Sequence, residues 1–311
     1  MPVRSRRSCL AVPGSNPRMI EKSRGLAVDY VFLDLEDAVA PAAKARARSA
    51  VAEAVAAGGW TAATVAVRVN DLSTPYTYRD VIEVVETAGS QLDVVVLPKV
   101  QRPEQVVWLD LLLTQIERTM GFPEGGVAIE AMVESARGLS QALAIAQASP
   151  RVEALVFGPG DYAADTGMRS PFVGAAPFEG ALDFPLHTIR VAATAAGVQA
   201  VDGPWQQVRD LDGLRTKASR SAGLGFDGIW VLHPDQVAVA DEVFTPAQGS
   251  YDHAELVLDA VAWYGSEAGG RRGAVMLGDE MVDEASRKLA LSVAVKGRAA
   301  GLTRTSSFTP G

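Results

Sequence analysis

Short apolar runs alternate with longer segments of helical periodicity along most of the chain. The runs are rich in Val, Ile, Leu and aromatic residues, and several contain no polar residue, which is typical of strands buried on both faces. We expect eight such strands, at residues 9–13, 30–35, 64–69, 93–97, 127–133, 154–157, 198–201 and 228–232.

The segments between these runs have apolar residues at three- and four-residue spacing, which predicts helices. They cover residues 17–26, 42–57, 76–88, 103–121, 135–148, 185–196, 206–222 and 235–243. Eight successive strand–helix units predict an α/β fold, a closed (β/α)8 TIM barrel. An open doubly wound sheet is the alternative, but it offers no reason for the repetition to stop at eight.

The rest of the chain follows a different pattern and predicts a helical extension at 246–311, after a barrel at 1–245. Residues 246–251 indicate a linker, and 252–268 and 280–299 indicate helices. Turns and a short apolar patch lie between the helices, and 303–311 indicates a frayed tail.

Composition narrows the functional classes. A single cysteine excludes a disulfide framework and a multi-cysteine zinc site. A net charge of −8 without a basic run argues against nucleic-acid binding. No apolar run approaches the ~18 residues of a membrane span. We therefore expect a cytoplasmic protein in a reducing compartment, with neither nucleic acid nor membrane as a partner.

Polar residues gather where the predicted strands end, and in a parallel barrel those ends form one mouth that carries the chemistry. Glu134 and Asp161 follow the fifth and sixth strands. Two neighbouring carboxylates favour one hard cation such as Mg²⁺, with Mn²⁺ as a substitute. The alternative is that each carboxylate caps the helix after it. The spacing leaves both open.

Arg68 ends an apolar strand, so it must be paired or point into the mouth. It either bridges to Glu36 or Asp37 as a structural contact, or holds a substrate carboxylate and stabilises an oxyanion. Glu36 and Asp37 either bind metal-bound water from behind the ligands or pair with Lys99 or Arg68. These alternatives have equal weight.

The N-terminal region is locally basic. Gly14 and Ser15 form a turn before a helix, which is a ready anion site, and Arg7, Arg18 and Lys22 flank the turn. A solvated terminus is the other interpretation, and it applies best to Arg4 and Arg6.

Nine sequence blocks resemble one known group, the citrate lyase beta-subunit and malyl-CoA lyase branch of the HpcH/HpaI aldolase superfamily. Together they extend the resemblance over about residues 5–300. The blocks are RSCLAVPGS at 7–15, LDLEDAV at 33–39, RVN at 68–70, PK at 98–99, MVESARG at 132–138, FGPGDYAAD at 157–165, DGP at 202–204, GFDG at 225–228 and HPDQ at 233–236.

The resemblance implies roles for individual residues. Glu134 and Asp161 match the Mg²⁺ ligands, and Arg68 matches an arginine that contacts the oxo acid and the enolate. The basic N-terminal blocks, with Arg7, Gly14, Ser15, Arg18 and Lys22, match a coenzyme A site. Gly160 stands where the family often has an acidic residue, and we expect it to line the substrate.

The resemblance also implies a C-terminal lid that covers a neighbouring subunit, in a homotrimer or homohexamer. Asp283, in the motif Met281-Val282-Asp283, matches the lid's acid/base residue.

The resulting hypothesis is a Mg²⁺-dependent lyase that cleaves or forms a 3-hydroxyacyl-CoA such as malyl-, methylmalyl-, citramalyl- or citryl-CoA. The products of cleavage are an acyl-CoA and a 2-oxo acid. The alternatives are a malyl-CoA thioesterase, a non-catalytic acyl-CoA-binding paralogue and a CoA-independent aldolase of the same superfamily.

Overall fold

The computed structural model describes residues 4–169 and 180–309. The chain divides into two compact units, Met1–Phe244 and Thr245–Gly311, which are taken separately below. Most of the segment 169–183, whose role the sequence leaves open, lies outside the described residues. No helix among the described residues is long and apolar enough to cross a membrane.

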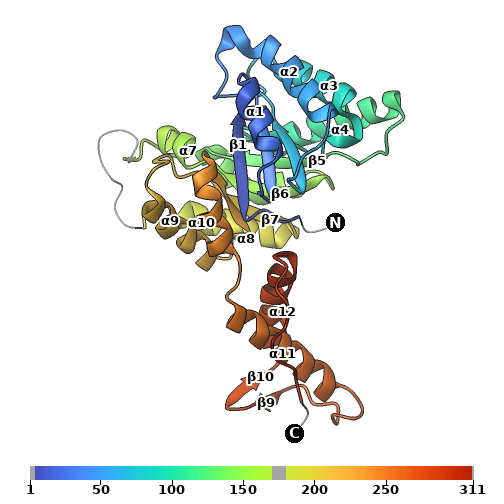
Figure 1. Cartoon of the computed structure of the whole chain (residues 1–311), viewed down its shortest axis with the longest axis vertical. Coiled ribbons are helices and arrows are strands. Elements are labelled where there is room, and N and C mark those ends of the chain that lie inside the picture. Colours follow the sequence, from blue (N-terminus) through green and yellow to red (C-terminus); the bar gives the residue numbers. More distant parts are fainter. Residues whose placement is uncertain (1–3, 170–179, 310–311) are drawn as a thin grey trace. The chain divides into compact units, whose positions relative to one another are not determined.

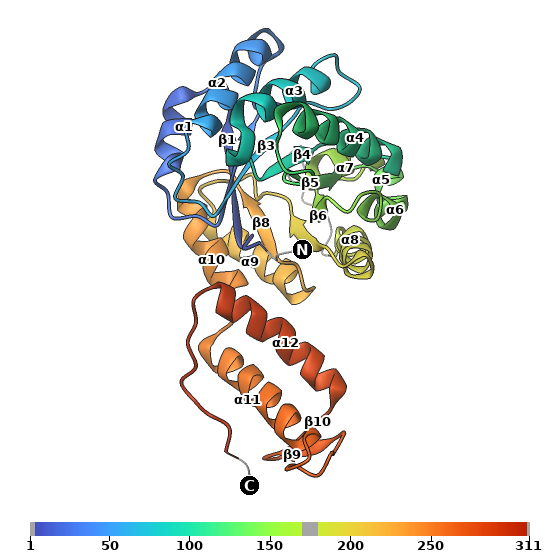
Figure 2. The ribbon, with the colours of Figure 1, turned by 90° about the vertical axis from the view of Figure 1, so that its right-hand side faces the viewer.

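Eight parallel strands of the described chain close into a barrel in sequence order, so the predicted TIM barrel is confirmed. Figures 1 and 2 show the strands surrounded by helices. The strands are β1 (Ser8–Pro13), β2 (Tyr30–Asp34), β3 (Thr64–Arg68), β4 (Val94–Leu97), β5 (Ala128–Val133), β6 (Val152–Phe157), β7 (Gln199–Asp202) and β8 (Gly228–Val231).

Alternation along each strand creates two apolar layers, because successive side chains of a strand point to opposite faces. Val31 and Leu33 belong to the layer between the sheet and the helices. Tyr30 and Phe32 belong to the barrel interior, where Phe32 contacts the ring of Trp230 at a centroid distance of 4.2 Å. The interior is therefore a packed core and not a channel.

A buried ionic network lies at the N-terminal end of the strands. Arg6 is 1% exposed, and its guanidinium donates to Glu130 and Glu153, each at 2.9 Å. Gln199 accepts a further bond from Arg6. Because these charges are paired and hydrogen-bonded, they can stay ionised beneath the apolar interior.

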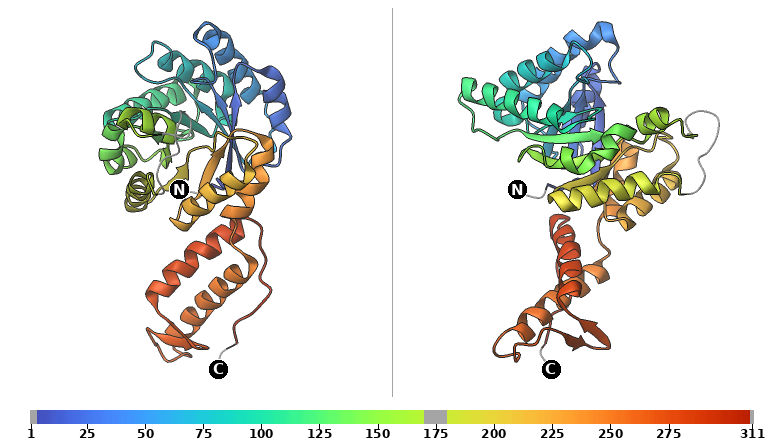
Figure 3. Two further views of the ribbon diagram at one scale, coloured as in Figure 1. Left: turned by 90° about the vertical axis from the view of Figure 1, so that its left-hand side faces the viewer. Right: turned by 180° about the vertical axis from the view of Figure 1, so that it is seen from behind.

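The helices mostly follow the prediction, and Figure 3 shows them from two further sides. They are α1 (Pro17–Arg24), α2 (Lys44–Ala56), α3 (Thr77–Ala88), α4 (Pro103–Met120), α5 (Ala136–Ser140), α6 (Ala142–Ala146), α7 (Pro159–Thr166), α8 (Asp183–Ala196), α9 (Leu211–Gly223) and α10 (Val237–Phe244), with short 3₁₀ turns at Pro41–Ala43, Gly89–Gln91 and Pro234–Gln236.

Two predicted helices differ from the structure, and one observed helix is not predicted. The helix predicted at 135–148 is two short helices, because Gln141 leaves the helical conformation with φ −116° and ψ 12°. The helix predicted at 206–222 begins at Leu211, where Asp210 caps it by accepting from the Gly213 N–H. Helix α7 was not predicted, and it begins at Pro159 directly after β6.

The C-terminal unit contains two long helices, α11 (Gln248–Gly265) and α12 (Glu284–Ala299), and a hairpin of β9 (Val275–Leu277) and β10 (Glu280–Val282). Ala254, Val257 and Val282 belong to its small apolar core. The predicted linker at 246–251 is wrong beyond its first residues, because α11 begins at Gln248. The helix predicted from 280 is wrong at its start, because β10 occupies 280–282.

The predicted frayed tail is also wrong for its described part, which packs along α11. Asp252 accepts bonds from both the backbone N–H and the hydroxyl of Thr305. The ring of Phe308 lies 6.4 Å from that of Trp263 and 6.1 Å from that of Tyr264, centroid to centroid. Aromatic contacts and the Asp252 carboxylate hold this segment against α11.

Candidate active site at the mouth of the barrel

Strand alternation delivers three charged side chains to the mouth. Asp34 follows Tyr30 and Phe32 on the inner face of β2, and Glu134 follows Met132 beyond β5. Arg68 ends β3 in direct register with Asp34. Alternate residues of each strand face the barrel interior, so the last inward-facing layer is charged while the layers below it are apolar. This charged layer lies at the end of the barrel where barrel enzymes place their chemistry.

Arg68 is bound by carboxylates on two sides. Its Nε and Nη2 donate to the two oxygens of Asp34, each at 2.7 Å, and its Nη1 lies 2.9 Å from Glu36 Oε2. Burial alone would lower the pKa of Arg68, but the charge and hydrogen bonds of Asp34 outweigh it, so the pKa lies above its ordinary value. The predicted contact of Arg68 with Glu36 is present, with Asp34 as an additional partner, and Asp37 is more distant at 3.9 Å.

The loop that carries Glu36 is fixed from behind. Asp34 accepts the backbone N–H of Glu36 at 2.9 Å and that of Ala38 at 3.1 Å. The ammonium of Lys44 donates to the carbonyls of Leu35 and Glu36. These bonds aim the Glu36 carboxylate, which is 5% exposed, at the mouth. Burial raises the pKa of Glu36, although Arg68 and Lys99 oppose the shift.

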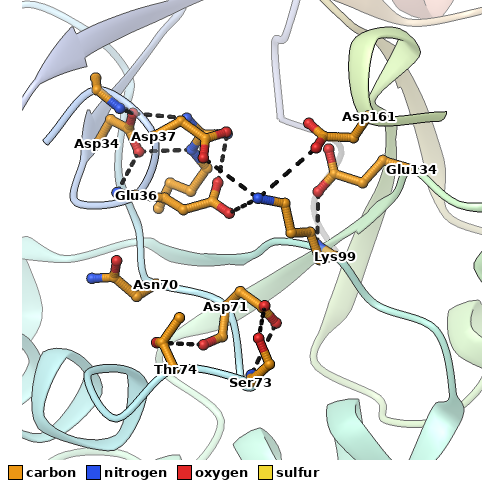
Figure 4. A network of polar contacts seen from close by, with 12 residues as sticks. Asp34, Glu36, Asp37, Asn70, Asp71, Ser73, Thr74, Lys99, Glu134 and Asp161 are labelled. Carbon is orange, nitrogen blue, oxygen red and sulfur yellow. Dashed lines mark hydrogen bonds and ion pairs between the residues drawn. The ribbon is translucent and has the colours of Figure 1, made fainter. Parts of the chain in front are cut away.

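Lys99 connects the two halves of the mouth, as Figure 4 shows. Its Nζ lies 2.8 Å from Glu36 Oε1, 3.4 Å from Asp37 Oδ1 and 3.9 Å from Asp161 Oδ1. Its backbone N–H donates to Glu134 Oε1 at 2.7 Å. Burial would lower the pKa of Lys99, but the hydrogen bond and charge of Glu36 raise it above its ordinary value, so the side chain is an ammonium.

Glu134 is 3% exposed, and its side chain fits against Gly158 because glycine has no Cβ. A Cβ at Gly158 would lie 2.2 Å from Glu134 Oε2 and 2.5 Å from Glu134 Cβ. Burial raises the pKa of Glu134 to about 8, and the negative charges of Glu36 and Asp161 add to the effect. The ionised form of this carboxyl is therefore disfavoured without a cation beside it, and a bound cation would favour it.

Asp161 faces Glu134 from the first turn of α7, and its side chain is 48% exposed. The capping alternative fails for both carboxylates. The N-cap of α7 is Gly158, and Asp161 lies inside the helix. Ser135, not Glu134, caps α5 by accepting from the Gly138 N–H.

The charges at the mouth do not balance. Among the described residues joined by these contacts, five carboxylates (Asp34, Glu36, Asp37, Glu134 and Asp161) face Arg68 and Lys99, which leaves −3 when all are ionised. The described residues form no group of three or more His, Cys, Asp or Glu arranged to hold a metal. Two carboxylate oxygens with excess negative charge suit Mg²⁺, which keeps waters or substrate oxygens as its other ligands.

A pocket of about 630 Å³ opens beside these carboxylates. Lys99, Glu134 and Asp161 line it, together with Ser73 and Arg102 from the loops after β3 and β4. Gly160, predicted to line the substrate, is next to Asp161 in α7, and a Cβ there would meet only Gln206 Nε2, at 3.6 Å. The pocket has room for a small oxo acid.

The predicted coenzyme A residues fall into two places. Gly14 and Ser15 follow β1, and Arg18 and Lys22 lie one helical turn apart on α1, exposed to solvent. Gly14 packs tightly, since its Cβ would lie 2.7 Å from the carbonyl oxygen of Asp34. Arg7 instead precedes β1 and pairs with Asp29 at 2.7 Å. The length of the strand separates Arg7 from the other four residues.

Asp283 belongs to the C-terminal unit, where it is the N-cap of α12. It accepts the backbone N–H of Ala285 at 2.9 Å and that of Ser286 at 3.0 Å. The Ser286 N–H holds the pKa of Asp283 below its ordinary value. The carboxylate is thus kept ionised, as a proton acceptor must be before it acts.

Sequence reasoning did not assign a role to three groups at the mouth. Asp34 has no predicted role, although opposite charges at the ends of neighbouring strands are a usable signal. Lys99 was considered only as an ion-pair partner. The ring of Trp230 lies under the guanidinium of Arg68 at 5.4 Å, and no sequence pattern predicts that contact.

Comparisons with known proteins show which family the chain belongs to. Residues 7–234 match the family HpcH/HpaI aldolase/citrate lyase. An L-malyl-CoA/beta-methylmalyl-CoA lyase of Cereibacter sphaeroides is 40% identical over 301 residues, 93% of each chain. A (3S)-malyl-CoA thioesterase of the same species is 34% identical over 254 residues, 82% of each chain. The structure of protein CitE from Mycobacterium tuberculosis, in complex with magnesium, acetoacetate and coenzyme A, is 29% identical with a TM-score of 0.72, and covers 95% of this chain and 98% of that one. The chain therefore belongs to the HpcH/HpaI aldolase/citrate lyase family.

Proposed function

We propose that this protein is a Mg²⁺-dependent carbon–carbon lyase acting on a 3-hydroxyacyl-CoA of the malyl-CoA or methylmalyl-CoA type. The observation that carries the proposal is the mouth of the barrel, where a surplus of carboxylates surrounds one arginine beside a pocket of oxo-acid size. The relative with 93% coverage, a malyl-CoA/methylmalyl-CoA lyase, supports the substrate class.

Glu134 and Asp161 would hold the Mg²⁺, which when bound supplies Lewis-acid polarisation of the oxo acid's oxygens. Among the protein's own side chains, Arg68 is the one we assign to stabilising the negative charge that develops in the reaction. Its Nη1 and Nη2 face Glu36 and Asp34, which fix the guanidinium plane in advance of the reaction. A fixed, water-poor cation stabilises the enolate of the departing acyl-CoA as its charge develops.

Asp283 is our candidate for the base that takes the C3 hydroxyl proton in cleavage and returns it in condensation. We propose that it acts on the site of a neighbouring subunit, as part of a lid formed by the C-terminal unit. Its lowered pKa keeps the carboxylate ionised over the neutral range, the state from which it can accept a proton.

Gly14, Ser15, Arg18 and Lys22 are our candidates for the coenzyme A site. The support is their common place at the start of α1, where backbone N–H groups and two exposed cations can meet phosphates. Arg7 is left out of this group because Asp29 engages its guanidinium at the other end of β1.

A malyl-CoA thioesterase is the second candidate, and the 34% identical relative with that activity favours it. The two reactions give different products. Cleavage of the carbon–carbon bond releases an oxo acid and leaves an acyl-CoA, whereas hydrolysis releases free coenzyme A and leaves the hydroxy acid. A non-catalytic acyl-CoA-binding paralogue would release neither.

The test is a panel of 3-hydroxyacyl-CoA thioesters with and without Mg²⁺, with oxo acid and free thiol followed separately. Release of oxo acid only with Mg²⁺, and its loss in Glu134→Gln, is the expected result. Thiol release without oxo acid would establish the thioesterase instead, and no turnover of any thioester would favour the paralogue.

Mixing two inactive variants tests the position of Asp283. Chains with Asp283→Ala and chains with Glu134→Ala should regain activity in mixed oligomers if the acid/base group acts between subunits. Confirmed subunit exchange without recovery would contradict this arrangement. We also propose a homotrimer or homohexamer in the cytoplasm, and the free, buried thiol of Cys9 is consistent with a reducing compartment.

A further inference from the structure

We infer that Lys99 is a positioning residue that holds both proposed metal ligands, Glu134 through its backbone and Asp161 through its side chain. The inference deepens the proposed function and rests on it.

The backbone of Lys99 is in an unusual conformation. Its φ is +53°, and Lys99 and Arg271 are the non-glycine residues of the described chain with a positive φ. Glycine accepts this conformation without strain, whereas a residue with a Cβ does not. The turn after β4 aims the Lys99 N–H at Glu134 Oε1. A lysine in a place that favours glycine indicates a use for its side chain.

The side chain spans the mouth. Its ammonium contacts Glu36 and Asp37 on the loop after β2 and reaches Asp161 on α7. Within the described residues, Lys99 is the cation within ion-pair distance of Asp161. The Asp161 side chain is half-exposed, so this ion pair is a restraint on a carboxylate that solvent leaves largely free. One residue therefore contacts both Glu134 and Asp161 and bears on how they point.

A simple counter-charge predicts the opposite effect on metal binding. Removing a cation from a cluster with excess negative charge strengthens the attraction for Mg²⁺. Removing a positioning residue weakens binding, because the two ligands no longer point to one place. The sign of the change in Mg²⁺ affinity distinguishes the two roles.

The experiment measures Mg²⁺ binding by calorimetry on metal-stripped, full-length protein without substrate. For Lys99→Met we expect a Kd about 10–100-fold higher than wild type, the usual effect of losing an outer-shell partner. Lys99→Arg should recover part of the affinity. Arg102→Met is the matched control, because Arg102 lines the same pocket and its loss changes the charge equally. It should leave the affinity unchanged or raise it.

Lys99→Gly separates positioning from a structural role. It keeps the N–H to Glu134 and accepts the positive φ, so its metal-free Tm should equal or exceed that of wild type while Mg²⁺ affinity falls as in Lys99→Met. Unchanged or tighter Mg²⁺ binding in Lys99→Met and Lys99→Gly overturns the inference alone. A wild-type protein that binds no Mg²⁺ overturns the proposed function as well.

Discussion

Gly158→Ala is the most direct test of how the barrel holds Glu134. The added Cβ would lie 2.2 Å from Glu134 Oε2, whereas ordinary contacts of this kind begin near 3.4 Å. Glu134 must therefore move by about 1 Å, a displacement that can cost about 10²-fold in rate. The backbone of Gly158, with φ −100° and ψ 89°, is open to alanine, so the strain falls on the contact with Glu134, whose Cβ would lie 2.5 Å from the new one.

Gly160→Ala is the control, two residues later on the same helix. Its Cβ meets only the Gln206 side chain at 3.6 Å, an ordinary contact. We expect Gly158→Ala to weaken Mg²⁺ binding about 10–100-fold and to reduce turnover, and Gly160→Ala to bind Mg²⁺ as wild type does. Calorimetric titration measures the affinity, and circular dichroism verifies the fold.

Two results would refute this reasoning. Normal Mg²⁺ affinity in a folded Gly158→Ala would mean that Glu134 is not a ligand or that it relaxes without cost. Equal damage in Gly160→Ala would mean that the effect comes from α7 as a whole and not from the contact with Glu134.

Four further predictions concern Arg68, Glu134 and Gly228. Arg68→Ala should lose about 10²–10³-fold in turnover. It should also lose about 3–5 kcal/mol in stability, because Asp34, 2% exposed, is left without its guanidinium partner. Arg68→Lys should lose less stability, and an unchanged Tm in Arg68→Ala would contradict the buried pair. Without metal, Glu134 has a pKa raised to about 8, so below that pH Mg²⁺ must displace a proton from it. The Mg²⁺ affinity should therefore fall by up to about tenfold for each unit by which the pH drops below 8, and calorimetry should detect proton release on binding. A Mg²⁺ affinity independent of pH would contradict this. The same raised pKa makes the folded state bind that proton more tightly than the unfolded chain, so metal-free wild type should lose stability relative to Glu134→Gln as pH rises from about 4.5 through 8. Gly228→Ala places a Cβ 1.5 Å from the carbonyl oxygen of Arg6 where β8 meets β1, so it should fail to fold, while Gly223→Ala, with nothing within 4 Å of its Cβ, should melt as wild type does.

The barrel could be predicted because its physics is local. Strands buried on both faces must be apolar along their whole length, so each predicted run lies within about two residues of an observed strand. The errors occur where tertiary contacts decide. Nothing in the segment after β6 separates a short helix from a turn, and the residues 280–282 become a strand only through pairing with 275–277.

The site was predictable to the same extent. The alternation of side chains along a strand places Arg68 and Glu134 at the mouth. They can be found in the sequence as charged residues at the C-terminal ends of apolar runs. The positive φ of Lys99 and its reach to Asp161 depend on how separate loops close together, which composition does not encode. Arg7 shows that residues close in sequence can lie far apart, because an extended strand places Arg7 and Gly14 at opposite ends of β1.

The charge at the mouth also has a kinetic consequence. The barrel interior beneath it is apolar, so the field of the uncompensated carboxylates is directed outward into solvent. A thioester that bears a carboxylate and coenzyme A phosphates is repelled by this field, while a divalent cation is drawn into it. Loading by the cation changes the net charge at the mouth from −3 to −1 and so weakens the repulsion of the anionic substrate. The same negative charges that raise the pKa of Glu134 therefore favour an order of addition, with the metal first and the thioester second.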